Sequence, residues 1–157
     1  MSTLNAQIKT TVASTANTTT VSNFINGSSV FYDGVTFTLK GSGNVQIIRD
    51  GETAPAADAR MHPVFLTSIA DDAYLWLSSF VRPKLDIKGK AVEKDGSFDK
   101  LVKDELAKDP NRSVDDALAA IVVAVNGRTI RVRRKPYEGF DRNGDKRVLS
   151  IVCLDLV

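Results

Sequence analysis

Residues 129–157 read TIRVRRKPYEGFDRNGDKRVLSIVCLDLV. Up to Lys135, apolar and basic side chains alternate, which is the pattern of a strand with one buried face. From Val148 to Val157 nearly every position is apolar, which is typical of a strand that is covered on both faces. Between these segments, Asn143-Gly144 favours the tip of a long hairpin, because tight hairpin turns need residues that adopt positive φ. The stretch therefore predicts two antiparallel strands.

A second region of period-two alternation covers residues 29–49. Its first two runs, 30–32 and 35–39, flank Asp33-Gly34, a pair that favours a two-residue hairpin turn. After Gly41-Ser42-Gly43 the alternation resumes. We therefore expect a three-stranded meander in this region.

Three helices are predicted between the meander and the hairpin. The first begins at Ser68 and ends before Pro83, with apolar residues at spacings of three to four. The second spans about residues 97–108. The third, about 113–125, begins at a Ser cap and ends at Asn-Gly, although its β-branched end also fits a strand.

This order of elements predicts an α+β fold, in which a small antiparallel sheet made of the N-terminal meander and the C-terminal hairpin carries two or three helices on one side. An OB-like barrel is a further version, although helices inserted before the last two strands are not its usual order. Sixteen of the first thirty residues are Ser, Thr or Asn. We therefore expect an N-terminal arm over residues 1–22 and a single domain over 23–157.

The composition excludes several classes of protein. The chain of 157 residues has one His and one Cys, which are too few for a structural zinc site or an internal disulfide. Its longest apolar run, residues 117–125, is too short to span a bilayer. The first twenty residues lack the basic start and apolar run of a signal peptide, so we expect a cytoplasmic location, or the virion if the protein is viral.

Two loop motifs lack residues that their function requires. Asp141, Asn143 and Asp145 resemble the first ligands of a calcium loop, but Lys146 replaces the required Gly and Val152 replaces the bidentate Glu. The glycines of residues 41–44 resemble a phosphate loop, but no Lys-Ser or Lys-Thr follows them. We therefore predict no metal and no cofactor.

The residue types that often catalyse reactions each have a non-catalytic explanation in this sequence. Cys153 lies in the most apolar segment, where a thiol is usually an inert small hydrophobe. His62 precedes a proline in a predicted loop, and no nucleophile or orienting acid is spaced to meet it. Asp71-Asp72 and Asp115-Asp116 fall in the first turns of predicted helices, where acids stabilise the helix dipole. We expect a protein that is not an enzyme, while an enzyme that uses other residues stays open.

The basic part of the C-terminal hairpin is the remaining candidate site. The net charge of the chain is only +2, but residues 126–157 alone carry +4. Cations can follow a phosphate backbone while aromatic rings stack on unpaired bases, so the hairpin predicts binding of single-stranded nucleic acid, as on OB-fold sheets. A solvated sheet face that resists edge aggregation explains the same cations. The candidate residues are Arg131, Arg133, Lys135, Tyr137, Phe140, Arg142, Lys146 and Arg147.

A hypothesis from another class is that the chain is a structural or assembly protein of a virus or phage particle. The Ser/Thr-rich arm, the mixed charge and the lack of reactive side chains fit this class. A long basic hairpin can contact the acidic face of a neighbouring subunit as well as a phosphate, so the expected partners are nucleic acid or other subunits, and a homo-oligomer is expected.

Overall fold

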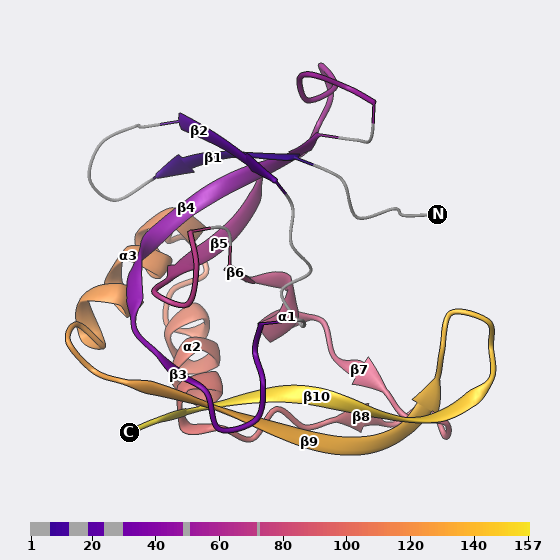
Figure 1. Cartoon of the computed structure of the whole chain (residues 1–157). Coiled ribbons are helices and arrows are strands. Elements are labelled where there is room, and N and C mark those ends of the chain that lie inside the picture. Colours follow the sequence, from indigo (N-terminus) through magenta and orange to yellow (C-terminus); the bar gives the residue numbers. More distant parts are fainter. Residues whose placement is uncertain (1–6, 13–18, 24–29, 49–50, 72) are drawn as a thin grey trace.

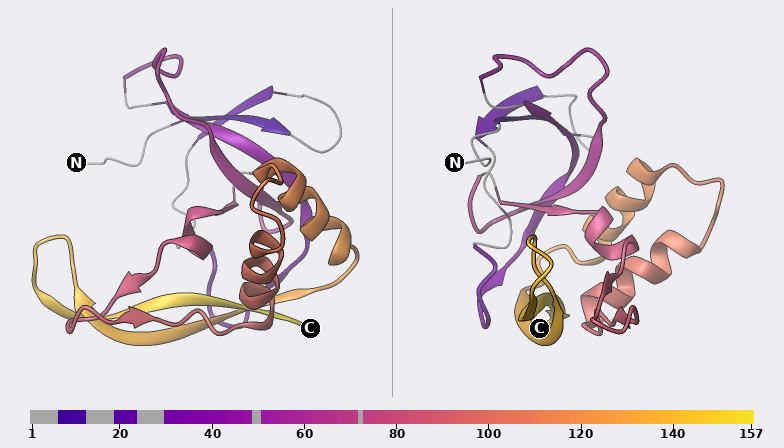
Figure 2. Two further views of the ribbon diagram at one scale, coloured as in Figure 1. Left: turned by 180° about the vertical axis from the view of Figure 1, so that it is seen from behind. Right: turned by 90° about the vertical axis from the view of Figure 1, so that its right-hand side faces the viewer.

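A computed structural model describes residues 7–12, 19–23, 30–48, 51–71 and 73–157. Within these ranges it confirms the α+β prediction, with helices between antiparallel strands of a larger and a smaller sheet (Figure 1). The two sheets lie on opposite sides of the main core, and the end of the C-terminal hairpin projects beyond the rest of the molecule (Figure 2).

The larger sheet has the strand order β2-β1-β4-β5-β6. All its neighbouring strands are antiparallel, and β4 pairs with β1 on one side and β5 on the other. Parts of the predicted arm, residues 1–22, thus form paired strands; its other residues lie outside the described ranges, and the domain division at residue 22 stays a prediction. The strands are β1 (Gln7–Val12), β2 (Thr19–Asn23), β4 (Leu39–Ile48), β5 (His62–Thr67) and β6 (Tyr74–Trp76).

The predicted meander over residues 29–49 is wrong. Residues 30–32 form no strand, and β3 (Thr36–Phe37) pairs with the C-terminal hairpin, whereas β4 belongs to the larger sheet. Asp33-Gly34 forms a turn in which only Gly34 has positive φ, at 86°, so it is not the predicted hairpin turn, in which both residues have positive φ. The glycines at 41 and 43 lie inside β4, where α3 packs closely on the strand.

The first predicted helix, from Ser68 to Pro83, is also wrong for most of its length. Its place is taken by β6, which pairs with β5, and by the short helix α1 (Ser78–Val81). The Thr67 hydroxyl donates a buried hydrogen bond of 2.7 Å to the Ala73 carbonyl and closes the turn between the strands. His62, predicted in a loop, begins β5. Pairing with the preceding strand β5 has overridden a helical spacing of apolar residues.

The other two helices are confirmed. Helix α2 (Ser97–Ala107) buries Phe98 and Val102, and helix α3 (Val114–Ala124) buries Leu118 and Ile121. Ser113 caps α3 as predicted, its hydroxyl accepting a hydrogen bond from the Asp116 backbone amide at 3.1 Å. Both helices pack into the main core, with Phe65, Phe80 and Phe98 forming edge-to-face ring contacts at its centre.

The C-terminal hairpin is confirmed and is longer than predicted. Strands β9 (Ile130–Phe140) and β10 (Lys146–Leu156) pair from Phe140↔Lys146 to Ile130↔Leu156, and the loop between them is only residues 141–145. Burial on both faces of β10 is limited to its C-terminal half, since Val148 is 74% exposed. With β3 the hairpin makes a sheet of order β10-β9-β3, and neither this order nor that of the larger sheet closes, so the described strands form no OB-like barrel.

A small hairpin that the sequence analysis missed lies beside β9. It consists of β7 (Lys84–Leu85) and β8 (Ala91–Val92). The Ile87 backbone amide in its turn donates to the Glu138 carbonyl at 3.1 Å, which ties the turn to the projecting part of β9. We call residues 136–150, which make up that projecting part, the hairpin arm.

Candidate nucleic-acid interface

The eight predicted binding residues all lie on the β9–β10 hairpin, but they do not form one surface. Alternation along the paired strands places Arg131, Arg133, Lys135, Tyr137 and Arg147 on one face. On the other face, Phe140 lies directly opposite Lys146. Arg142 is in the connecting turn. The predicted site therefore divides into a region near the base of the hairpin, a middle region and a tip.

At the base, two of the predicted cations are paired with acids of the same chain. Arg133 contacts Asp95 at 2.8 Å and Asp155 at 3.2 Å, while Lys135 contacts Asp95 at 3.2 Å and the Glu93 carbonyl at 3.1 Å. Hydrogen bonds from Arg133 and then Lys135 lower the pKa of Asp95 to about 2. The same carboxylates raise the pKa of Arg133. These two cations join the segment before α2 to β9, and their charge is already balanced.

Arg134, which is not among the eight predicted residues, contacts the segment beside β9 on the side away from β10. Its backbone amide donates to the Asp33 carboxylate and its Nε to the Phe31 carbonyl, both at 2.8 Å. The Val132 amide donates to Val35 on the same edge. Arg133 and Arg134 are adjacent in the basic run but contact different parts of the fold, which the run itself does not reveal.

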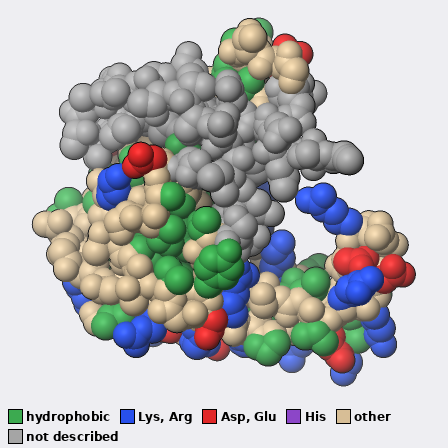
Figure 3. All heavy atoms as spheres, viewed as in Figure 1, with side chains coloured by type: hydrophobic (Ala, Val, Ile, Leu, Met, Phe, Trp, Pro, Cys, Tyr) green, Lys and Arg blue, Asp and Glu red, His purple; other side chains and the backbone are tan. Residues whose placement is uncertain are grey.

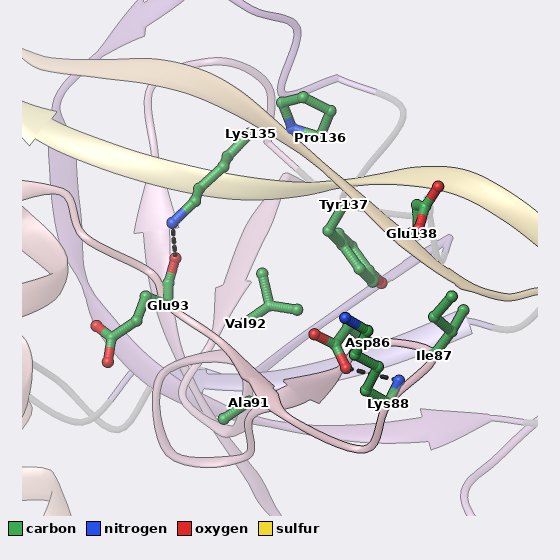
Figure 4. Close-up of a pocket in the computed structure, with 10 residues that line it drawn as sticks. All are labelled: Asp86, Ile87, Lys88, Ala91, Val92, Glu93, Lys135, Pro136, Tyr137 and Glu138. Carbon is green, nitrogen blue, oxygen red and sulfur yellow. Dashed lines mark hydrogen bonds between the residues drawn. The ribbon is translucent and has the colours of Figure 1, made fainter.

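The middle region borders a cleft of about 430 Å³ between β9 and the β7–β8 turn (Figure 4). Tyr137 points into this cleft, and its ring packs over Gly139, where a Cβ would come within 2.9 Å of the ring. The charged groups that line the cleft are three acids and two lysines, so its charge does not favour a phosphate. They are Asp86, Glu93, Glu138, Lys88 and Lys135.

One acid of this cleft holds the β7–β8 turn in place. The Asp86 carboxylate accepts hydrogen bonds from the backbone amides of Lys88 at 2.8 Å and Lys90 at 2.9 Å. The hydrogen bond from Lys90 is the main cause that lowers the pKa of Asp86. Since its carboxylate is satisfied by the turn, Asp86 is part of the local structure of this hairpin.

At the tip, Asp141 has a structural role. One of its oxygens accepts hydrogen bonds from the backbone amides of Asn143 at 2.9 Å and Asp145 at 3.0 Å, and the other contacts Arg147 at 2.7 Å. The Arg147 hydrogen bond is the main cause that lowers the pKa of Asp141. This arrangement makes the tight turn, with φ of 81° at Gly144. Among the described residues, no group of three or more His, Cys, Asp or Glu could hold a metal ion.

The remaining tip residues are accessible. Phe140 is 55% exposed, an unusual state for a phenyl ring, and its cross-strand partner Lys146 is exposed as well. Neither Lys146 nor Arg142 forms an ion pair with a described residue. Figure 3 shows Lys and Arg side chains at the projecting end of the hairpin, with Asp and Glu side chains among them. A ring beside two unpaired cations is the part of the predicted site that keeps the expected chemistry.

The groups considered for catalysis lie in different parts of the fold. Cys153 is buried, and this burial raises the pKa of its thiol. Burial, followed by the charges of Arg60 and Arg82, lowers the pKa of His62. Asp115 accepts a hydrogen bond from the Asn44 amide at 3.0 Å. The prediction that the chain is not an enzyme stays a prediction.

Comparison with known proteins finds no matching family model, no similar curated protein and no similar solved structure. No helix within the described ranges is both long enough and apolar enough to cross a membrane.

Proposed function

We propose that the chain binds single-stranded nucleic acid through the tip of its hairpin arm. The observation that carries the proposal is the pair Phe140 and Lys146, an exposed ring and an exposed cation directly opposite each other on a projecting hairpin. Arg142 adds an exposed cation in the adjoining turn.

The chemistry of this tip suits an unpaired strand with little base preference. Every base has a π-face that can stack on Phe140, and such a stack contributes about 1–3 kcal/mol. If Lys146 and Arg142 each contact one phosphate, the logarithm of the binding constant falls with the logarithm of salt concentration with a slope of about −1.4. At the base of the hairpin, Arg133 and Lys135 add little, because Asp95 and Asp155 neutralise them.

Fluorescence anisotropy with a labelled oligothymidylate tests this proposal. Phe140→Ala and Lys146→Glu are each expected to weaken binding about tenfold, through loss of a stack and of a phosphate contact. Tyr32→Ala and Lys100→Glu are matched controls, because both residues are exposed and lie outside the hairpin arm. Binding that is absent at low salt, or that the two arm variants leave unchanged, would refute the proposal.

The edge of β10 favours a second candidate, assembly with another copy of the chain. Helix α2 covers the end of this edge, where Leu154 donates to Asp99 and Leu156 donates to the Ser97 hydroxyl. Closer to the tip, the outward amides and carbonyls of residues 148, 150 and 152 have no hydrogen-bond partner among the described residues. The segment reads Val-Leu-Ser-Ile-Val and has neither a charge nor a proline to protect it. The segment is nearly palindromic, so two copies that pair antiparallel place similar residues opposite each other.

The variant Val148→Lys separates the two candidates. A lysine on an exposed edge opposes strand pairing, so an assembled protein should dissociate, as measured by light scattering during size-exclusion chromatography. The same lysine adds a cation to the arm and should maintain or strengthen oligonucleotide binding. A wild-type protein that is monomeric at high concentration would contradict the assembly candidate.

A further inference from the structure

A second cleft, which shares Val92 of β8 with the cleft in Figure 4, has a different charge. On one side lie α1 and the two residues that follow it, and on the other lies helix α2. The cleft has a volume of about 440 Å³. We call it the basic cleft. Its lining includes the cations Arg82, Lys94 and Lys103 and the apolar residues Val81, Pro83 and Leu106.

The lining contains three cations and no carboxylate. Arg82, Lys94 and Lys103 form no ion pair with any described residue. They come from three separate segments of the chain, so only the fold brings them together. Unlike Arg133 and Lys135 at the base of the hairpin, these three cations contact no described acid within ion-pair distance.

Lys94 is the cation closest to the core. Its ammonium group lies 5.1 Å from the centre of the Phe80 ring, a cation–π contact that supports it on one side. Burial is the main cause that lowers the pKa of Lys94; the charges of Lys103 and Lys84 lower it further, and that of Asp99 opposes them. A bound anion would complete this site electrostatically.

Asp99 is near but does not serve as that anion. One of its carboxylate oxygens accepts the backbone amides of Gly96 and Leu154, and no ion pair within 4 Å joins Asp99 to Lys94. Its charge offsets part of the charge of Lys94 and Lys103 without an ion pair to either. The open side of the cleft keeps its positive charge.

We infer that the basic cleft binds a phosphate ester of nucleotide size. A phosphate presents several strong acceptor oxygens and up to two negative charges, which match a cleft lined by three cations better than a single carboxylate does. The apolar part of the lining, Val81, Pro83 and Leu106, offers a wall to an aromatic base. The phosphate can belong to a free nucleotide or to a nucleic-acid strand. This inference does not depend on the hairpin arm.

The test is a calorimetric titration with thymidine 5′-monophosphate, with thymidine, inorganic phosphate and oligothymidylate as comparisons. The monophosphate is expected to bind at least about tenfold more tightly than thymidine, because only the monophosphate has charge-assisted hydrogen bonds to the cations. An oligothymidylate affinity that falls with Arg82→Glu indicates a strand in the cleft, and one that this variant leaves unchanged indicates a free nucleotide. No binding of the monophosphate at millimolar concentration, or equal binding of thymidine, would overturn the inference.

Variants localise the site. Arg82→Glu and Lys103→Glu are each expected to weaken binding of the monophosphate about tenfold or more, and both residues are exposed, so the fold should tolerate the changes. Lys100→Glu is the matched control, since it changes the same charge on the exposed side of α2 outside the cleft. Equal weakening by the control would show that only net charge matters and would overturn the site.

Two further readouts separate this inference from the function proposed for the arm. Bound monophosphate should raise the pKa of Lys94, which nuclear magnetic resonance of its ammonium group can follow. Phe140→Ala should leave binding of the monophosphate unchanged while it weakens binding of the oligonucleotide. If oligonucleotides fail to bind but the monophosphate binds, the arm proposal fails and the basic cleft stands.

Discussion

The carboxyl group of Asp99 links helix α2 to the edge of β10 from a fully buried position. The residue is 0% exposed. One oxygen accepts two hydrogen bonds, from the Leu154 amide at 2.8 Å and from the Gly96 amide at 3.2 Å. The other oxygen has no hydrogen-bond partner among the described residues. Asp99 therefore holds two amides in place, at the cost of burying a carboxyl group.

Replacing Asp99 by Ala should destabilise the fold. Each hydrogen bond to a charged acceptor contributes about 1.5–3 kcal/mol, and removing the buried carboxylate recovers part of its desolvation, so the expected net loss is about 2–4 kcal/mol. Asp99→Asn keeps an oxygen for both amides and removes the charge. It should stay within about 1 kcal/mol of the wild type. Urea denaturation followed by circular dichroism measures both free energies of unfolding.

The dependence on pH provides a sharper check. Burial raises the pKa of Asp99 above that of the unfolded chain, while Lys94 and Lys103 and the two backbone amides oppose this effect. The folded state then binds the proton more tightly, so the stability from this group is fully present below pH 4 or so and declines as pH rises through the folded pKa. Relative to Asp99→Asn, the wild type should lose stability over that window. A wild type that gains stability there, or an Asn variant as unstable as the Ala variant, would refute the reasoning.

Three other changes test particular parts of the fold. Asp95→Ala removes a carboxylate whose pKa is lowered to about 2, so this group stabilises the fold above pH 4 and its contribution is lost as pH falls toward 2. Because Asp95 and its partners Arg133 and Lys135 are largely exposed, the variant should lose only about 0.5–1 kcal/mol of unfolding free energy in denaturation. A larger loss would contradict a surface role. The same variant removes the ion pair of Lys135 and leaves Arg133 paired with Asp155 alone, so it should tighten oligonucleotide binding, measured by anisotropy. Ile130→Asp places an unpaired charge at a fully buried position and should unfold the domain, so a cooperative thermal transition near that of the wild type would count against the β9 assignment. Gly96→Ala places a Cβ against the Leu154 carbonyl and should cost about 1–3 kcal/mol, whereas unchanged stability in denaturation would mean that α2 does not meet β10 so closely.

The candidate site was only partly predictable. The hairpin that carries all eight predicted residues follows from local alternation, and its pairing is as expected. Nothing in the basic run distinguishes Arg133, whose charge is balanced by Asp95 and Asp155, from Lys146, which has no described ion pair. The reason is that Asp95 lies 38 residues before Arg133 in the chain, and electrostatic pairing depends on distance in space.

The sequence by itself determined the elements whose signals are local. Ser113 and the Asn-Gly after α3 mark the ends of that helix, and the alternation of Ile130 and Val132 identifies β9, because caps and periodicity depend on neighbours within a few residues. Only the tertiary structure decided which strands pair. It separated β3 from β4 and brought Arg82, Lys94 and Lys103 around one cleft. Strand pairing and clustering of charges join residues that are far apart in the chain, and a pattern read over ten residues holds no record of such partners.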